Sequence, residues 1–263
     1  MNVKKKTIVV TGAGNGIGRE LTLLLLDQGA SVAAVDINEA YLQETSELAG
    51  TKRKKLSTHV VNITDRQAVL SLPEEVLEAH GSIDSVINVA GIIQKFVKID
   101  DMDFEAIERV MDINFWGTVN MTKAFLPYLM QRGEAHVVNI SSMGGFLPVP
   151  GQSVYGASKA AVRLFTEGLH SELKNTNVNV SLVFPGAIAT NIKANSGLAA
   201  DDNTSNLITT PAKAAETIFK GMQKDKYHIF IGKDAMVMNI LNNLLPKTAA
   251  TLIRSQMKAH IPV

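Results

Sequence analysis

Short runs of β-branched and aliphatic residues alternate along the chain with longer stretches in which apolar residues recur every three or four positions. The short runs predict strands and the longer stretches predict amphipathic helices, because side chains return to one face every 2 residues in a strand and every 3.6 in a helix. Strands alternating with helices form βαβ units, whose right-handed crossovers place helices on both faces of a parallel sheet. The pattern therefore predicts an α/β fold with a doubly wound parallel sheet. The expected strands are Thr7–Val10, Ser31–Val35, His59–Asn62, Ser85–Asn88, His136–Ile140, Val178–Phe184 and His228–Ile231.

A single domain is expected over residues 1–263, because no internal repeat, linker or shift in composition divides the chain. The polar stretch Ala200–Asn206 predicts a loop. Thr210 and Pro211 then predict the start of a helix, since proline is favoured in the first helical turn.

Charge and composition narrow the function further. The 26 Lys and Arg residues nearly balance the 25 Asp and Glu residues, which argues against a nucleic-acid binder. The absence of Cys excludes disulfides, thiolate nucleophiles and Cys-bound metals, and it fits a reducing compartment. The six His show no ligand spacing, so we expect no metal. The apolar stretch after Lys4–Lys6 ends at Gly12, too short for a secretory signal, and no run approaches a membrane span, so we expect a soluble, cytoplasmic protein.

A glycine-rich turn joins the first strand to the first helix. It contains Gly12, Asn15, Gly16, Ile17 and Gly18. Free backbone N–H groups and the helix dipole favour an anion there, and glycine lets the backbone approach a pyrophosphate closely. The alternative is a tight structural turn, which the strand and helix on either side disfavour.

An acidic residue ends the second predicted strand. Asp36 lies 18 residues after Gly18, near the offset at which a carboxylate meets the ribose of a dinucleotide. It would repel a 2′-phosphate, and neither Ile37 nor Asn15 offers a compensating charge, so we expect NAD rather than NADP. The alternative is that Asp36 caps the following helix.

Tyr155 and Lys159 stand four residues apart in a helical pattern, so both project from one face. No other Tyr in the chain has a Lys at that offset. Ser142 lies 13 residues upstream, just after a predicted strand, and the carboxyl ends of such strands are where ligands bind.

These three residues suit proton transfer at an alcohol or carbonyl oxygen. A phenol has a pKa of about 10, and a nearby ammonium would lower it. Tyr155 would then exchange a proton while hydride moves to or from the cofactor, and Ser142 would hydrogen-bond the reacting oxygen.

The motifs together resemble the short-chain dehydrogenase/reductase family in its shorter, single-domain form. The segment Thr11–Gly18 resembles the TGxxxGxG cofactor motif, and residues 88–91 resemble the NNAG motif with Val89 in place of the second Asn. The segment from Pro185 is similar to the PGxxxT motif at the nicotinamide end. The resemblance implies a Rossmann-like three-layer αβα fold and a catalytic set of Asn114, Ser142, Tyr155 and Lys159.

The resemblance also implies roles for single residues. Lys159 would bind the nicotinamide ribose, and Asn114 would hold a water that extends a proton relay. Asn62 stands where many relatives have an Asp near adenine. The further cofactor contacts expected are Tyr155, Ile63, Asn88, Ala90, Gly91, Pro185, Gly186, Ile188 and Thr190.

The leading hypothesis is an oxidoreductase that transfers hydride between NAD(H) and a secondary alcohol or ketone. Its substrate contacts would include Ser142, Met143, Gln152 and Tyr155 and a loop over residues 191–210, and the mostly apolar wall favours an apolar or mid-sized small molecule. By resemblance, helices over residues 114–130 and 155–174 form subunit contacts, so we expect a homodimer or homotetramer. The alternatives are an extended-family epimerase or dehydratase, for which the chain has little room, and a non-catalytic NAD-binding sensor or scaffold.

The C-terminal segment 235–263 predicts two amphipathic helices. Val237, Ile240, Leu241, Leu244 and Leu245 share one face, and Pro246 ends the first helix. The segment either completes the core or covers the substrate cleft, with residues 247–263 as the lid. Neutral Asn residues on its polar face disfavour contact with a membrane.

Overall fold

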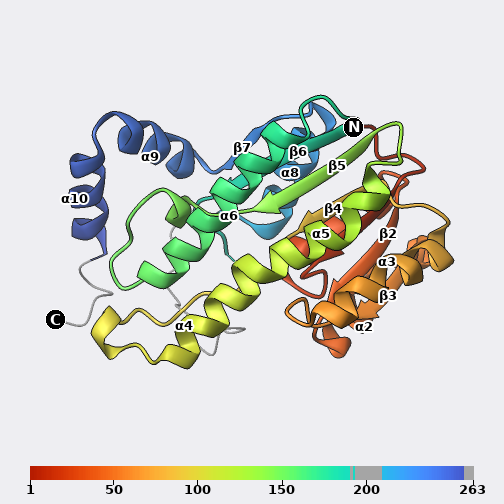
Figure 1. The fold of residues 1–263 in the computed structure, drawn as a ribbon, viewed down its shortest axis with the longest axis horizontal. Coiled ribbons are helices and arrows are strands. Elements are labelled where there is room, and N and C mark those ends of the chain that lie inside the picture. The colour runs from red at the N-terminus through yellow and green to blue at the C-terminus, as the bar shows by residue number, and fades with distance from the viewer. Residues whose placement is uncertain (190–191, 193–208, 258–263) are drawn as a thin grey trace.

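The computed structural model describes residues 1–189, Ile192 and residues 209–257. Within them, seven parallel strands form one sheet in the order β3-β2-β1-β4-β5-β6-β7 (Figure 1). The doubly wound α/β prediction is confirmed. The strands are β1 (Thr7–Thr11), β2 (Ser31–Asp36), β3 (Leu56–Val60), β4 (Ser85–Asn88), β5 (Ala135–Ile140), β6 (Val178–Pro185) and β7 (His228–Ile231).

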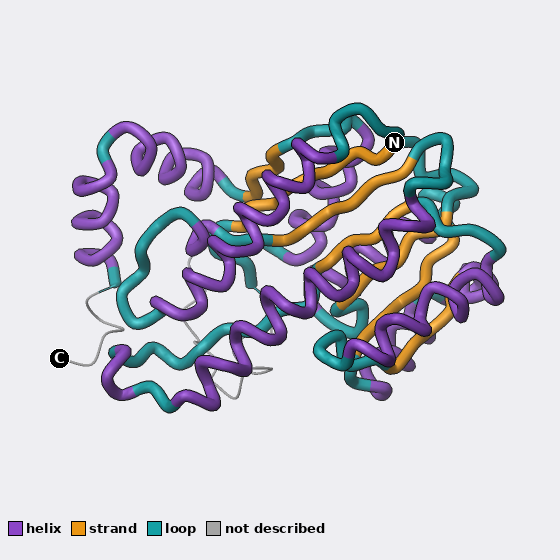
Figure 2. Tube along the Cα trace, in the orientation of Figure 1, coloured by secondary structure: helices purple, strands orange, loops and turns teal. Residues whose placement is uncertain are grey.

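Helices cover both faces of the sheet, as Figure 2 shows. On one face, α1 and α8 pack on the strands through buried aliphatic side chains such as Leu21 and Ile218. On the other, α3, α5 and α6 contribute Leu72, Phe125 and Leu169. The described helices are α1 (Gly16–Asp27), α2 (Glu39–Leu48), α3 (Arg66–His80), α4 (Phe104–Met111), α5 (Gly117–Leu129), α6 (Ser153–Glu172), α8 (Pro211–Gln223), α9 (Lys233–Leu244) and α10 (Pro246–Gln256).

The strand order reverses between β1 and β4, which are neighbours in the sheet although two strands separate them in the chain. The connections on either side of this point leave in opposite directions, so a crevice opens at the carboxyl ends of the strands. The glycine turn follows β1 at this edge.

The predicted third strand was displaced from its true position. The structure pairs β3 with β2 from Leu56 opposite Val32 to Val60 opposite Asp36, so Asn62 lies beyond the strand. β3 is an edge strand in which only His59 is buried, and its first residues, Leu56 and Ser57, are not β-branched, so the sequence pattern did not mark them as a strand. The basic residues before it, Lys52–Lys55, lie in an exposed 3-10 helix, η1 (Gly50–Lys55).

The C-terminal helices form, but the predicted face is not the buried one. Ala235 and Met238 of α9 face inward, whereas Val237, Ile240 and Leu244 are 60%, 54% and 73% exposed. Periodicity located an apolar face without showing whether a neighbour covers it. Pro246 opens α10 rather than merely ending α9, and α9 and α10 lie at the opposite end of the molecule from α2 and α3 (Figure 1).

Two short connections close the base of the predicted substrate loop. Ile188 and Thr209 form a parallel bridge, and the Ala189 N–H donates to the Thr209 carbonyl at 2.9 Å. Thr210 caps α8 by accepting from the Lys213 N–H, as the sequence predicted. Thr190, Asn191 and residues 193–208 lie outside the described part of the chain.

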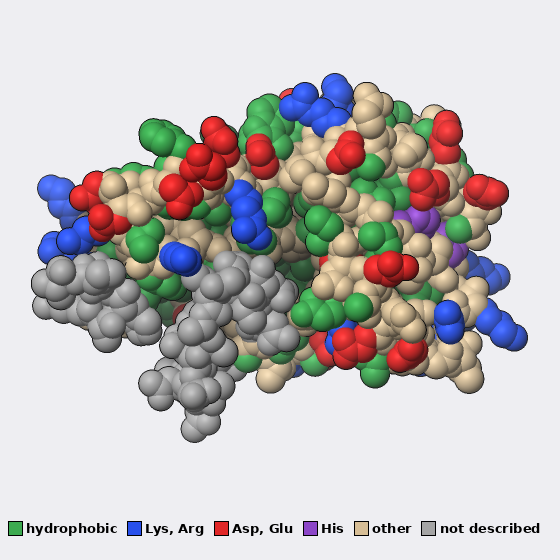
Figure 3. All heavy atoms as spheres, turned by 90° about the horizontal axis from the view of Figure 1, so that it is seen from below, with side chains coloured by type: hydrophobic (Ala, Val, Ile, Leu, Met, Phe, Trp, Pro, Cys, Tyr) green, Lys and Arg blue, Asp and Glu red, His purple; other side chains and the backbone are tan. Residues whose placement is uncertain are grey.

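None of the helices among the described residues combines the length and apolar composition that crossing a membrane requires. On the face seen in Figure 3, acidic and basic side chains are interspersed, in keeping with the balanced charge of the sequence.

Candidate active site

The glycine turn is folded so that only glycine fits two of its positions. Gly12 has a φ of +66°, and a Cβ there would lie 3.0 Å from the Ala90 backbone. A Cβ on Gly18 would lie 2.1 Å from the Gly12 carbonyl oxygen. Asn15 caps α1, its side chain accepting from the Gly16 N–H at 2.6 Å. The turn therefore brings backbone N–H groups to the start of a helix, where an anion is stabilised.

Two side chains that the sequence analysis missed hold this turn from behind. The Arg19 Nε donates to the Gly14 carbonyl at 2.8 Å, and the Thr45 hydroxyl donates to the Ala13 carbonyl at 3.0 Å. Arg19 also pairs with Glu44 at 2.6 Å. These hydrogen bonds use carbonyl groups of the turn. The Arg19 guanidinium is already engaged by Gly14 and Glu44.

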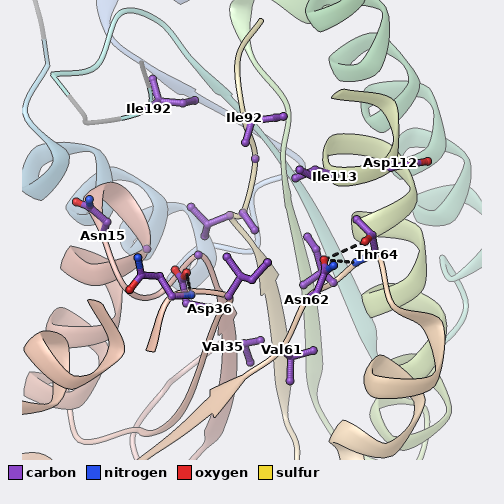
Figure 4. Close-up of a pocket in the computed structure, with 18 of the residues that line it drawn as sticks. Asn15, Val35, Asp36, Val61, Asn62, Thr64, Ile92, Asp112, Ile113 and Ile192 are labelled. Carbon is purple, nitrogen blue, oxygen red and sulfur yellow. Dashed lines mark hydrogen bonds between the residues drawn. The ribbon is translucent and has the colours of Figure 1, made fainter. Parts of the chain in front are cut away.

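A cavity of about 830 Å³ opens along the carboxyl ends of β1, β2 and β4 (Figure 4). A hollow of this size lined by a glycine cradle fits a dinucleotide, with its pyrophosphate at the N-terminus of α1. The predicted cofactor residues that line it are Gly12, Asn15, Gly16, Ile17, Gly18, Asp36, Ile37, Asn62, Ile63, Ala90 and Gly91.

Asp36 is fixed at the end of β2 by main-chain donors. Its carboxylate accepts from the Gly14 N–H at 2.9 Å and from the Asn38 N–H at 3.0 Å. Asn38, not Asp36, caps α2 by accepting from the Tyr41 N–H. The helix-cap alternative for Asp36 is therefore wrong, and the carboxylate faces the cavity beside the exposed Ile37.

Asn62 lies at the far end of the same cavity (Figure 4). Its Oδ1 accepts from the Thr64 N–H at 3.1 Å and from the Thr64 hydroxyl at 2.9 Å. Two donors from Thr64 thus already engage the Asn62 oxygen, which leaves the side-chain NH₂ group to face a ligand. The structure adds a wall that the sequence analysis missed, formed by Ile113 and by the charged residues Glu105, Glu108, Arg109 and Asp112.

Asn88 was predicted to touch the cofactor, but its side chain turns into the core. It is 3% exposed and donates to Asn139 Oδ1 at 2.8 Å and to the Thr122 hydroxyl at 3.2 Å. The following peptide N–H groups of Val89 and Ala90 donate to the Thr11 hydroxyl at 3.0 and 3.1 Å. Asn88 therefore fastens β4 to its neighbours beneath the cavity.

Ser142, Tyr155 and Lys159 meet where β5 ends and α6 begins. The Ser142 hydroxyl accepts from the Gly144 N–H at 3.0 Å, and its interaction with the Tyr155 phenol acts to lower the pKa of that group. Lys159 is 4% exposed, and its Nζ donates to the Ile140 carbonyl at 3.0 Å. Lys159 is thereby tied to the last residue of β5.

Burial controls the titration of both groups. It raises the pKa of the Tyr155 phenol above its ordinary value, and the interaction with Ser142 opposes that shift only in part. It lowers the pKa of Lys159 to about 8. The sequence analysis expected a lowered Tyr155 pKa, whereas in the cofactor-free protein loss of hydration is the largest effect and the pKa is raised.

Asn114 lies in a π-helical turn, η3 (Asp112–Trp116), between α4 and α5. Its Oδ1 accepts from the Ile92 N–H at 2.8 Å, and its Nδ2 donates to the Ile92 carbonyl and to the Ser158 hydroxyl, both at 3.0 Å. A Cβ on Gly91 would lie 3.0 Å from Asn114 Oδ1 and 3.1 Å from Lys159 Nζ. The glycine therefore leaves space between the amide and the ammonium.

The Pro185–Gly186 segment is fastened by a residue that the sequence analysis missed. Asp234, in the first turn of α9, accepts from the Ala187 N–H at 3.0 Å, and a Cβ on Gly186 would collide with this carboxylate. Ile188 follows in the bridge to Thr209. The start of α9 is thus coupled to the strand end expected to meet the nicotinamide.

Of the predicted substrate residues, Gln152 lines a second, smaller hollow, whereas Ser142, Met143 and Tyr155 are not part of its lining. Met143 follows Ser142 in a short 3-10 helix, η4 (Met143–Gly145). Gln152 is 3% exposed, lines a hollow of about 490 Å³, and has a buried Oε1 without a hydrogen-bond partner. The rest of the lining is mostly glycine, alanine, proline and aliphatic residues, so this hollow is apolar.

Comparison with known proteins identifies the family. The model of the short chain dehydrogenase family matches residues 6–201. The chain is 35% identical to SadH of Mycobacterium tuberculosis, which is named as an oxidoreductase, over 98% of this chain and 97% of that protein. It is 37% identical to an uncharacterized oxidoreductase of Staphylococcus epidermidis over 72% of this chain and 80% of that protein. The chain belongs to the short-chain dehydrogenase/reductase family.

Solved structures share the fold. A short-chain dehydrogenase/reductase from Burkholderia phymatum, in complex with NAD, superposes with a TM-score of 0.85 at 21% identity, over 94% of this chain and 96% of that chain. A short-chain dehydrogenase from Burkholderia cenocepacia, in complex with NADP, gives 0.83 at 24% identity, over 96% and 99%. The family and its Rossmann-like architecture are as the sequence predicted, and the two complexes carry different cofactors.

The buried ammonium predicts a measurable stability cost. Because the pKa of Lys159 falls from 10.5 unfolded to about 8 folded, the unfolded chain binds more protons between these values. The free energy of unfolding contributed by this group therefore rises with pH across that window and is lowest below pH 8. We expect Lys159→Met to raise the free energy of unfolding at pH 7 by about 1–3 kcal/mol, with a smaller gain near pH 10.

Denaturant titration of the cofactor-free protein at both pH values measures this effect. Lys123→Met, at an exposed position of α5, is the matched control and should change stability by about 0.5 kcal/mol or less. A Lys159→Met protein less stable than wild type at pH 7, or a gain that is independent of pH, would contradict the assignment.

Proposed function

We propose that this protein transfers a hydride between NAD(H) and a secondary alcohol or the matching ketone, with Tyr155 as the acid and base. The observation that carries the proposal is the meeting of Ser142, Tyr155 and Lys159 at the carboxyl edge of the sheet, next to a cavity built for a dinucleotide. When bound, NAD supplies the hydride acceptor or donor. A sensor would need only the glycine turn, so the presence of Ser142, Tyr155 and Lys159 favours catalysis over that alternative. An extended-family epimerase or dehydratase stays the alternative enzyme, because it shares the Tyr and Lys pair.

Each side chain then has a defined task. Tyr155 exchanges a proton with the substrate oxygen, and the Ser142 hydroxyl donates a hydrogen bond to that oxygen. Lys159, whose Nζ donates to the Ile140 carbonyl, would bind the ribose hydroxyl groups of the cofactor, and its charged form would favour the ionised phenol of Tyr155. The space that Gly91 leaves between Asn114 and Lys159 suits a water molecule that passes the proton to solvent.

The charges around the cavity favour NAD over NADP. Asp36 would repel a 2′-phosphate, and Arg19 is engaged with Gly14 and Glu44. Arg109 lies on a wall that also carries three carboxylates, so that wall is acidic on balance.

A change at the end of β2 should reverse this preference. We expect wild type to bind NADP at least about tenfold more weakly than NAD, and Asp36→Ala combined with Ile37→Arg to shift the ratio toward NADP. Calorimetric titration with each dinucleotide measures it. Leu48→Arg, an exposed position at the end of α2, adds the same charge away from the cavity and should leave the ratio unchanged. Equal affinity of wild type for both cofactors would refute the role of Asp36.

Removal of one hydroxyl should stop turnover. We expect Tyr155→Phe to lower kcat by about 10²- to 10⁴-fold while NAD still binds, because proton transfer is lost and little volume changes. The assay follows NADH absorbance with purified protein and a panel of secondary alcohols. Tyr227→Phe, before β7, should leave the rate unchanged. A Tyr155→Phe enzyme with near wild-type turnover would place proton transfer elsewhere.

The C-terminal helices are proposed to cover the substrate. Ala249 and Ile253 of α10 pack with Met238 against Leu147, in the segment that follows Ser142. A cover here would keep water from the reacting atoms. The end of the predicted lid, residues 258–263, lies outside the described chain.

Truncation separates a cover from a core element. We expect deletion of residues 247–263 to raise KM for the substrate while NAD affinity stays nearly constant. Thermal unfolding of the truncated protein is the control for folding. Unchanged substrate kinetics in a folded protein would refute the cover, and an unfolded protein would show that the segment completes the core.

Assembly and location complete the proposal. Trp116, Met130 and Leu164 are exposed apolar residues on the helices expected to meet a second subunit, which supports a homodimer or homotetramer. The Cys-free composition supports a cytoplasmic location.

A further inference from the structure

A buried amide in the loop after β4 has no part in the functions assigned so far. Gln94 is 5% exposed and makes three hydrogen bonds. Its Oε1 accepts from the Tyr155 N–H at 2.7 Å, and its Nε2 donates to the Gly151 carbonyl at 3.0 Å. The main-chain carbonyl of Gln94 accepts from Gln152 Nε2 at 3.0 Å. Both ends of the Gln94 side chain are therefore engaged at the start of the catalytic helix.

The start of α6 needs a partner of this kind. The first N–H groups of a helix have no acceptor within the helix, and a side chain at the N-cap normally supplies one. Gln152 stands at the N-cap of α6 and makes no such bond, and Tyr155 is the third residue of the helix. Gln94 supplies the missing acceptor from a position 61 residues away in the sequence.

The main-chain carbonyl of Tyr155 is also connected to the loop after β4, through Ser158 and Asn114. The Tyr155 carbonyl accepts from the Ser158 hydroxyl at 2.7 Å, and that hydroxyl accepts from Asn114 Nδ2. Asn114 binds both main-chain groups of Ile92. The main-chain N–H and C=O of Tyr155 are thus both tied to residues 92–94.

We propose that Gln94 is a positioning residue that fixes the main chain of Tyr155, and through it the phenol, for proton transfer. The inference rests on the proposed function, in which Tyr155 is the acid and base. A displacement of about 1 Å in a reacting group can cost on the order of 100-fold in rate, so one anchored peptide group is sufficient to matter. Gln94 does not line the dinucleotide cavity, so its loss should act on turnover rather than on NAD binding.

Two substitutions separate the acceptor from the rest of the side chain. Gln94→Met keeps the side-chain volume and removes both hydrogen bonds of the side-chain amide. Gln94→Glu keeps an acceptor for the Tyr155 N–H and loses only the hydrogen bond donated to the Gly151 carbonyl. Gln131→Met is the matched control, because Gln131 is exposed and its amide donates to Pro127 within α5.

The kinetic readout uses the secondary alcohol that gives the highest rate in the panel. We expect Gln94→Met to lower kcat by about 10- to 100-fold and to shift the limb of the pH profile that reports Tyr155, with NAD affinity unchanged. Gln94→Glu should recover most of the rate, and Gln131→Met should match wild type. Wild-type kcat in Gln94→Met, or equal losses in kcat and NAD affinity, would overturn the proposal.

Hydrogen exchange at the Tyr155 amide tests the bond without turnover. Faster exchange in Gln94→Met, with protection restored in Gln94→Glu, is expected, and unchanged exchange in Gln94→Met would overturn the proposal even if that variant were slow. Tyr155→Phe, assayed beside these variants, distinguishes failure of the proposed function from failure of the positioning role. Its full activity would refute the proposed function, whereas its inactivity beside an unimpaired Gln94→Met would refute the positioning role alone.

Discussion

A buried ammonium at the junction of β5 and α6 is the constraint on which the rest of the site depends. Lys159 is removed from water, which lowers its pKa to about 8, and its Nζ has the Ile140 carbonyl as an acceptor. The Ser141 hydroxyl donates to the Lys159 carbonyl at 2.7 Å, so both the side chain and the main chain of this residue are joined to the end of β5. The same low hydration raises the pKa of the neighbouring phenol of Tyr155. The site is therefore costly without its ligand, and the two packed layers of helices on the sheet must carry that cost.

The sequence predicted strand positions well where burial on both faces of the sheet is the single cause of the apolar pattern. Strands such as β1 are buried on both faces, so they appear as short apolar runs, here Ile8–Val10, with polar residues at their ends. The edge strand β3 has water on much of its surface and begins with Leu56 and Ser57, which are not β-branched, so its predicted boundaries were wrong. The prediction of the buried face of α9 was wrong for a related reason. An apolar stripe shows where a helix could be covered, but not whether a neighbour covers it. Val237 and Leu244 remain exposed.

In the candidate site, too, features set by local spacing were predicted and contacts between distant segments were not. Tyr155 and Lys159 are one helical turn apart and the glycine turn is a short segment, so local geometry alone predicts both. The side chains that hold them come from elsewhere in the chain: Gln94 reaches Tyr155, and Asp234 reaches the peptide after Gly186. Such pairs depend on tertiary packing and leave no local pattern. The direction of the Tyr155 pKa shift was wrong because the degree of burial cannot be obtained from spacing.

An ultraviolet titration of tyrosinate, taken as wild type minus Tyr155→Phe, tests most directly whether burial governs the ionisation of the Tyr155 phenol. The account predicts that Tyr155 ionises above the ordinary tyrosine pKa of about 10 in cofactor-free protein. It also predicts ionisation at lower pH with saturating NAD, whose nicotinamide ring is positively charged. Ionisation of Tyr155 below pH 10 before any cofactor is added would contradict the account.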